Sequence, residues 1–185
     1  VMHDIFISDN DVQNSSAFTA IEVVGKSRSG REKFRDAGYG ILRHVEIMRN
    51  RVVNSGFRPG KSPTSSMPAI GLILPETGHV AGNLVDGSWG NGIFTMGGKS
   101  SGAINEVPLN RLYFHHNKLE NLMLGCNDYG GLEIFQGGPA YFYSNIVHNT
   151  VGTKTFTGTE LGYALYFDGG FKIYAFNNIL TGRIE

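Results

Sequence analysis

The stretch CNDYGGLEIFQGGP at residues 126–139 has the form of a turn, a short strand and a glycine stop. Its strand is similar to other short segments along the chain: AIEVVG at 20–25, AIGLIL at 69–74, GIFTMGG at 92–98 and ALYFDGG at 164–170. Their side chains are expected to point alternately to the two faces of a sheet, with the period of two that is typical of strands. The recurrence indicates that one structural unit repeats along the chain.

A second pattern recurs in each unit: apolar residues, then Asn or Ser, then an apolar residue two places later. The position is occupied by Asn10, Asn50, Asn83, Asn117, Ser144 and Asn177. The intervals run from 27 residues (Asn117 to Ser144) to 40 residues (Asn10 to Asn50). Each unit therefore holds two or three short strands, and no stretch has a convincing helical period.

Short repeated strands cannot each bury a face alone, but stacked coils can, because every strand then pairs in parallel with the coil below, about 4.8 Å away. On the Asn positions and the apolar strands around them, the chain resembles the right-handed parallel β-helix (pectin-lyase-like) family, in its carbohydrate-active branch. An inward Asn at a turn can bond backbone groups that the bend would leave unpaired. We expect an all-β solenoid of about five to six coils over residues 1–185.

Length and charge limit the possible partners. The 185 residues suffice for one domain with a real core, and the formal net charge of +0 gives no reason to expect nucleic acid or a membrane as a partner. No apolar run approaches the roughly 20 residues that span a bilayer. A single cysteine, Cys126, excludes an internal disulfide. The chain opens on Val without a signal-peptide pattern, so we expect a processed chain or part of a longer protein.

The ends and the insertions of the solenoid bear on its partners. Bare coil ends would expose strand edges and apolar core, so we expect a further domain or a partner to cap them. Insertions at 26–43, 57–68, 98–108 and 151–162 border the strands of the first set, and such insertions often gather on a binding face. The first carries the basic cluster Lys26, Arg28, Arg31, Lys33 and Arg35. This cluster either binds an acidic polysaccharide or is a solvated loop balanced by its own acids.

Two acids lie on the same set of strands. An inward position is predicted for Ile21, Ile70, Ile93, Leu132 and Leu165. Glu133 and Asp168 then become diagonal neighbours on the outer face, with backbones about 8 Å apart. If the Gly-Gly pairs are aligned instead, Gln136 becomes the neighbour of Asp168. A general acid paired with a base or nucleophile would suit glycosidic cleavage; the alternative is two solvated carboxylates.

The roles of the acids follow from their neighbours. Glu133 is predicted to face solvent as the proton donor, because Phe94 and Tyr166 would raise the pKa of its carboxyl. Asp168 ends its strand beside glycines whose backbone N–H groups can keep it ionised, as the base or nucleophile requires. Asp128, in the turn before the Glu133 strand, is either a third catalytic acid or a cap of its own turn.

Aromatic residues next to these strands suggest a sugar-binding platform. Trp89, Tyr129 and Tyr163 lie one to three residues before strands and are predicted to form a row along one sheet edge. The alternative is that the rings stack on one another and cover the turn. The complete predicted substrate-binding set is Trp89, Phe94, Tyr129, Gln136, Tyr163 and Tyr166.

No metal or cofactor is expected. His115 and His116 are adjacent and are predicted to point to opposite faces of a strand, and no histidine spacing matches a metal site. The Gly-Gly pairs are followed by neither a helix nor a Lys-Ser/Thr pair, so they are interpreted as turn glycines.

The resemblance implies a polysaccharide-degrading enzyme, secreted, periplasmic or at the cell surface, and most specifically a glycoside hydrolase with a poly- or oligosaccharide as partner. The chain departs from the polygalacturonase pattern, since it has no N-T-D, D-D or R-I-K motif. One alternative is a polysaccharide lyase or epimerase of the same fold. Another is a non-catalytic carbohydrate-binding or adhesin β-helix.

Overall fold

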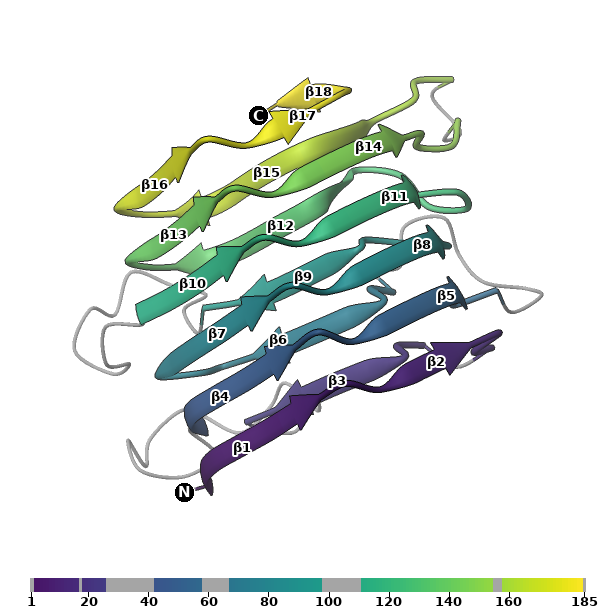
Figure 1. The fold of residues 1–185 in the computed structure, drawn as a ribbon. Coiled ribbons are helices and arrows are strands. Elements are labelled where there is room, and N and C mark those ends of the chain that lie inside the picture. Colours follow the sequence, from purple (N-terminus) through teal and green to yellow (C-terminus); the bar gives the residue numbers. More distant parts are fainter. Residues whose placement is uncertain are drawn as a thin grey trace, which may run out of the picture.

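The computed structural model describes residues 2–16, 18–25, 42–57, 67–97, 111–154 and 158–184. In this part of the chain it contains strands and no helix, and the strands form three parallel sheets of six strands each. Successive coils stack into a right-handed parallel β-helix, with the N-terminal coil at one end and the C-terminal coil at the other (Figure 1). The predicted fold is therefore confirmed.

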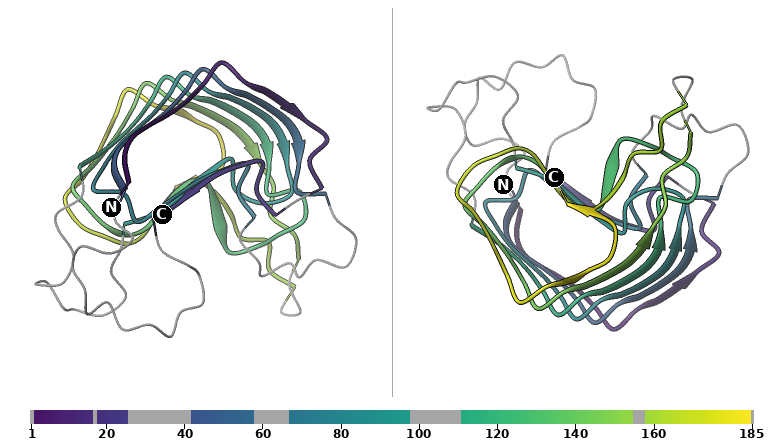
Figure 2. Two further views of the ribbon diagram at one scale, coloured as in Figure 1. Left: turned by 90° about the horizontal axis from the view of Figure 1, so that it is seen from below. Right: turned by 90° about the horizontal axis from the view of Figure 1, so that it is seen from above.

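Each coil contributes one strand to each sheet. Sheet A contains β1 (Met2–Ser8), β4 (Leu42–Met48), β7 (Thr77–Ala81), β10 (Arg111–His115), β13 (Ala140–Tyr143) and β16 (Ile173–Phe176). Sheet B contains β2 (Asp11–Gln13), β5 (Arg51–Ser55), β8 (Leu84–Ser88), β11 (Lys118–Leu122), β14 (Ile146–Thr150) and β17 (Ile179–Leu180). Sheet C contains β3 (Ile21–Val24), β6 (Ile70–Ile73), β9 (Ile93–Met96), β12 (Tyr129–Gly137), β15 (Gly162–Gly170) and β18 (Arg183–Ile184). Viewed along the stack, the coils superpose, with the sheets as their sides (Figure 2).

Sheet C is the sheet predicted from the stretch at 126–139 and its relatives. Its register aligns the expected inward column, which consists of Ile21, Ile70, Ile93, Leu132 and Leu165. All five are buried and belong to one continuous apolar core, to which sheets A and B also contribute. Phe135 pairs with Asp168, so Glu133 and Asp168 are diagonal as predicted, and the alternative that places Gln136 opposite Asp168 is wrong.

A ladder of asparagines runs along the corner between sheets A and B. Its members are Asn10, Asn50, Asn83, Asn117, Asn145 and Asn178. The first five side-chain amides each donate to the Oδ1 of the next Asn at 2.8–3.0 Å. All six donate to a sheet A carbonyl. The ladder was predicted, but its assignment to Ser144 and Asn177 in the last two coils is wrong by one residue.

The backbone explains this shift. The residue before each ladder Asn has a positive φ of 54–66°, and these residues are Asp9, Arg49, Gly82, His116, Ser144 and Asn177. This left-handed residue turns the chain from sheet A into sheet B, and the Asn that follows it points inward. Ser144 and Asn177 therefore make the bend, and Asn145 and Asn178 make the ladder.

The insertions lie largely outside the described residues, which omit 26–41, 58–66, 98–110 and 155–157. The predicted basic cluster of Lys26, Arg28, Arg31, Lys33 and Arg35 falls in the first of these gaps. The described residues contain no helix of the length and apolarity needed to cross a membrane.

Candidate functional site

Glu133 lies in the middle of β12, on the side of the strand that faces away from the core. Its column in sheet C pairs it with Phe94 of β9 and Tyr166 of β15. The side chain is only 2% exposed, so the prediction that it faces solvent is wrong. The carboxyl is covered instead: its Oε2 accepts hydrogen bonds from Gly130 N and Asn91 Nδ2, each at 2.7 Å.

The local sequence explains how the carboxyl is held. Gly130 precedes Glu133 by three residues, and a Cβ at this position would lie 2.8 Å from the Cβ of Tyr166, so only glycine fits without a shift. Asn91 is fully buried in the coil below and also donates to Gly130 O at 2.8 Å. Its amide therefore fixes both the glycine turn and the acid.

Asn91 was not identified from the sequence. It lies 42 residues from Glu133 and outside the asparagine ladder. In the sequence, Asn91 stands between the two glycines of Trp-Gly-Asn-Gly at 89–92, a pattern that predicts a turn and gives no other sign of the contact with Glu133.

Burial raises the pKa of Glu133 to about 8. The charges of Asp168 and Asp128 act in the same direction, while the hydrogen bonds from Gly130 and Asn91 oppose it. The raised pKa was predicted, and burial is its main cause. At neutral pH the carboxyl is mostly protonated and can donate a proton.

The other two acids are more accessible. Asp168 of β15 is half-buried. Asp128 is exposed, in the turn before β12, where its positive φ of 65° and the bond from its N–H to Leu161 O fix the backbone. Both carboxylates act on Glu133 and also on Tyr166, whose pKa is raised to about 12, first by burial and then by these charges. The structure thus brings the three predicted acids within electrostatic range of one another.

The turn that carries Asp128 is fastened to the chain before β15. Asn127 Oδ1 accepts a bond from Leu161 N at 2.6 Å, and its Nδ2 donates to Thr159 O at 3.3 Å. Next to this contact is an open hollow of about 390 Å³. It is lined by Thr150, Val151, Lys154, Gly158, Thr159, Glu160, Gly162 and Gly182.

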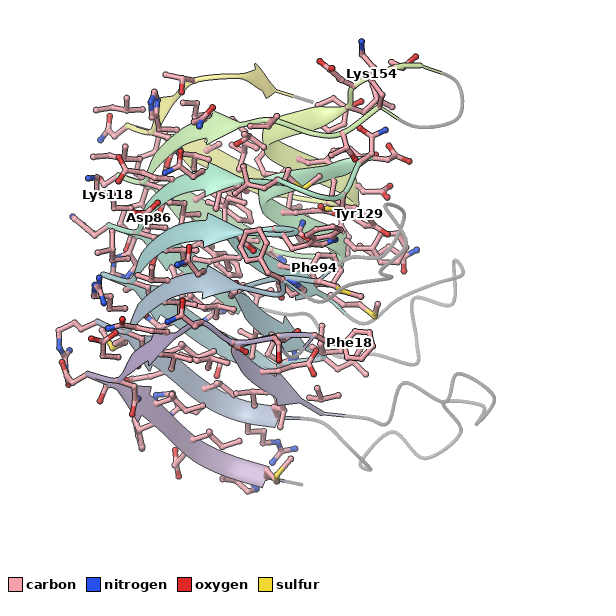
Figure 3. The ribbon with its side chains drawn as sticks, turned by 90° about the vertical axis from the view of Figure 1, so that its right-hand side faces the viewer. Phe18, Asp86, Phe94, Lys118, Tyr129 and Lys154 are labelled. Carbon is pink, nitrogen blue, oxygen red and sulfur yellow. The ribbon has the colours of Figure 1, made fainter. Side chains whose placement is uncertain are left out.

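Each residue of the predicted aromatic row packs against a different part of the molecule. Trp89 packs edge to face on Phe57, with ring centroids 6.0 Å apart, and its carbonyl accepts a bond from Gly125 N. Tyr129 packs on the core instead (labelled in Figure 3), and Tyr163 is only 8% exposed, with its ring 4.8 Å from that of Tyr166. The predicted row and its alternative, in which these rings stack on one another and cover the turn, both stay predictions.

The remaining members of the predicted binding set differ in accessibility. Phe94 is buried, at 5% exposure, so it can shape the surroundings of Glu133 but offers little surface to a ligand. Gln136 is half-buried, with a positive φ of 59°, and lies against Gly169. Tyr166 is the partly exposed ring next to the acids.

The adjacent histidines correct another prediction. The rings of His115 and His116 contact each other, with the two Nδ1 atoms 2.9 Å apart, so they do not point to opposite faces. The positive φ of His116 breaks the strand alternation and returns its ring to the same side. The described residues contain no group of three or more His, Cys, Asp or Glu side chains placed to hold a metal ion.

Comparison with known proteins adds no relative. No family model matches the chain, and no curated protein and no solved structure matches it. The structure by itself shows a parallel β-helix in which a buried carboxyl with a raised pKa lies near two acids that solvent can reach.

Proposed function

We propose that the chain is the β-helical domain of a polysaccharide-degrading enzyme, a glycoside hydrolase of the pectin-lyase-like kind acting outside the cytoplasm. The observation that carries the proposal is the carboxyl of Glu133. Its pKa is raised to about 8, and it lies within electrostatic range of Asp168 and Asp128. Glycoside hydrolysis needs two carboxyl groups with opposite protonation states. In this chain, burial favours the protonated form of Glu133, whereas Asp168 and Asp128 are more accessible to solvent.

In this proposal Glu133 donates a proton to the glycosidic oxygen of the leaving sugar. Both N–H donors bond to its Oε2, so its acidic proton belongs on Oε1. Asp168 is the base that activates water or the nucleophile that attacks the anomeric carbon, and Asp128 is a third acid at the exposed edge. Because Glu133 is 2% exposed, the mechanism requires the side chains over Oε1 to rearrange when a sugar chain binds.

A lyase or epimerase of the same fold is less well supported. Such an enzyme needs a base, often Lys or Arg, close to a neutralised uronate. The two outward columns of sheet C contain Glu22, Gly71, Phe94, Glu133 and Tyr166, and Val24, Ile73, Met96, Phe135 and Asp168. Neither column holds a basic residue in the described strands.

A non-catalytic carbohydrate-binding β-helix is the second candidate. It is favoured by the two hydrogen bonds at Glu133 Oε2, because the bond from Asn91 would tie β12 to the turn below and the bond from Gly130 would hold the start of β12 itself. In that case the acid would be a structural tether, and its replacement would alter only stability.

An activity screen on a panel of polysaccharides tests the proposal, with released reducing ends measured against the absorbance of unsaturated products. Glu133→Gln and Asp168→Asn should each lower turnover by at least about 10²-fold while the protein stays folded. Glu22→Gln is the matched control, because Glu22 occupies the same outward column in another coil and is exposed. Undiminished activity in either acid variant removes that residue from the mechanism, and unsaturated products would identify a lyase.

A further inference from the structure

The outer face of sheet A carries two columns of stacked rings, away from the acids of sheet C. In the first, His79, Tyr113, Tyr141 and Tyr174 follow one another with centroids 4.6, 5.1 and 4.9 Å apart. In the second, His115, Tyr143 and Phe176 are 4.7 and 5.2 Å apart and nearly parallel. Parallel register produces both columns, because residues at the same position in successive coils lie directly above one another.

The stacking decides which part of each ring a ligand can reach. The flat faces of the inner rings are turned towards their neighbours in the column, so the ring edges and the tyrosine hydroxyls remain. Tyr113, Tyr141 and Tyr143 are half-buried, and Tyr174 and Phe176 are 48% and 47% exposed. Ring edges carry the positive side of the aromatic quadrupole, so a row of edges favours negatively charged oxygens.

The charges on this face agree with that preference. The strands β7, β10, β13 and β16 contain no Asp or Glu. Arg111 at the start of β10 and Lys172 just before β16 are exposed cations beside the rings. His79, His115 and His116 also lie there, and burial together with the other two histidines lowers the pKa of His115, which favours its neutral form. Acids begin where the first column ends: Glu46 of β4 is the register neighbour of His79, and it binds His44 together with Asp4. Glu76, directly before β7, is paired with Arg43.

We propose that the outer face of β7, β10, β13 and β16 binds an acidic polysaccharide, one that bears carboxylate or sulfate groups, along the stack of coils. The cations and ring edges contact the acidic groups, and the tyrosine hydroxyls bond the sugar hydroxyls. Nucleic acid fits less well, because bases bind by stacking on ring faces, and most of these faces are occupied. Only the choice of a polysaccharide as ligand rests on the proposed function; the surface itself does not involve Glu133.

The test measures binding of an oligogalacturonate to the whole chain by calorimetry, beside a neutral xylo-oligosaccharide and a single-stranded oligothymidylate. The double variant Arg111→Gln/Lys172→Gln should weaken binding of the acidic oligosaccharide by about tenfold or more. Tyr141→Phe/Tyr174→Phe, which keeps the stack but removes two hydroxyls, should weaken it to a smaller degree. The matched control is Arg51→Gln/Lys118→Gln, which removes the same charge from sheet B, where Figure 3 shows Lys118 on the side away from Phe94.

The outcomes separate this proposal from the enzymatic one. Glu22→Gln, an exposed position on sheet C outside the proposed catalytic acids, should bind the acidic oligosaccharide as the unmodified chain does. Absent binding, equal loss in the sheet B control, or a preference for the neutral sugar or the oligothymidylate would each overturn the sheet A proposal. None of these results would bear on hydrolysis at Glu133, which the activity screen measures separately.

Discussion

The asparagine ladder and the Glu133 site are both made of buried polar side chains, yet they affect the stability of the fold in different ways. Asn83, Asn117 and Asn145 are almost fully buried, and each one bonds the next coil and a backbone carbonyl. Glu133 is equally buried and accepts two bonds, but it is the buried acid of a column whose other members are Glu22, which is exposed, Gly71, Phe94 and Tyr166.

The difference lies in repetition and in charge. An amide stays neutral at every accessible pH, so a ladder of amides satisfies each bend without any dependence on pH. A buried carboxyl can keep a low-energy state only by holding its proton, which is why burial raises the pKa of Glu133. Raised pKa values of this kind gather at functional sites, and this agrees with the proposed donor role.

The largest effect is expected from the middle of the ladder. Asn117→Ala removes the acceptor of two bonds from Asn83 and the donor to Val80 O and Asn145. Buried groups are then left without partners, so the free energy of unfolding should fall by about 3–5 kcal/mol in urea titrations. A loss below about 1 kcal/mol would mean that the ladder does not stabilise the fold as its geometry indicates.

The second effect concerns the pH dependence of stability. The pKa of the Glu133 carboxyl is about 8 in the folded chain, compared with an ordinary pKa of 4.5. Between these two pKa values, the folded chain holds a proton that the unfolded chain has lost. The free energy of unfolding that depends on Glu133 is therefore greatest below about pH 4.5 and falls as the pH rises towards 8. The slope is at most about 1.4 kcal/mol per pH unit.

Glu133→Gln keeps a neutral side chain of the same shape and should remove this decline. The variant and the unmodified chain should be similar near pH 4.5, and the variant should become the more stable one as the pH rises, in urea titrations across that range. Glu22→Gln in the same column supplies the control. A constant difference between variant and unmodified chain over this range would show that Glu133 does not titrate there.

A smaller effect is expected from the amide that supports the acid. Asn91→Ala removes a hydrogen bond that favours the charged form of Glu133, so the pKa of Glu133 should rise further. Carbon-13 NMR titration of the glutamate carboxyl groups would measure this shift. The loss of the bond to Gly130 O should also cost about 1–2 kcal/mol of stability. A lowered pKa would contradict the arrangement of donors around Oε2.

The smallest effect is expected at the exposed end of the ladder. Asn10 is exposed, and its side chain donates to Ser8 O and Asn50 Oδ1, where water can replace it. Asn10→Ala should therefore lower the free energy of unfolding by about 1 kcal/mol or less. Equal losses at Asn10 and Asn117 would show that burial is not what gives the ladder its strength.

Much of the fold could be predicted from the sequence because it depends on periodicity. Alternation within strands and recurrence between coils predicted the order of sheet C and its inward column from Ile21 to Leu165. The ladder was predicted to within one residue, and the error at Ser144 and Asn177 came from the left-handed backbone, which local patterns of polar residues do not reveal. The same conformation at His116 reversed the predicted direction of its ring.

The sequence alone determined the stacking of the coils, because an apolar residue repeated at the same position in successive coils can be buried only by pairing the coils in register. Which outward side chains meet solvent was decided only by the tertiary structure. Glu133 and Glu22 share one column, yet one is buried and the other exposed. The difference comes from Asn91, Phe94 and Tyr166, which surround Glu133 from other coils and are brought to it only when the chain has folded.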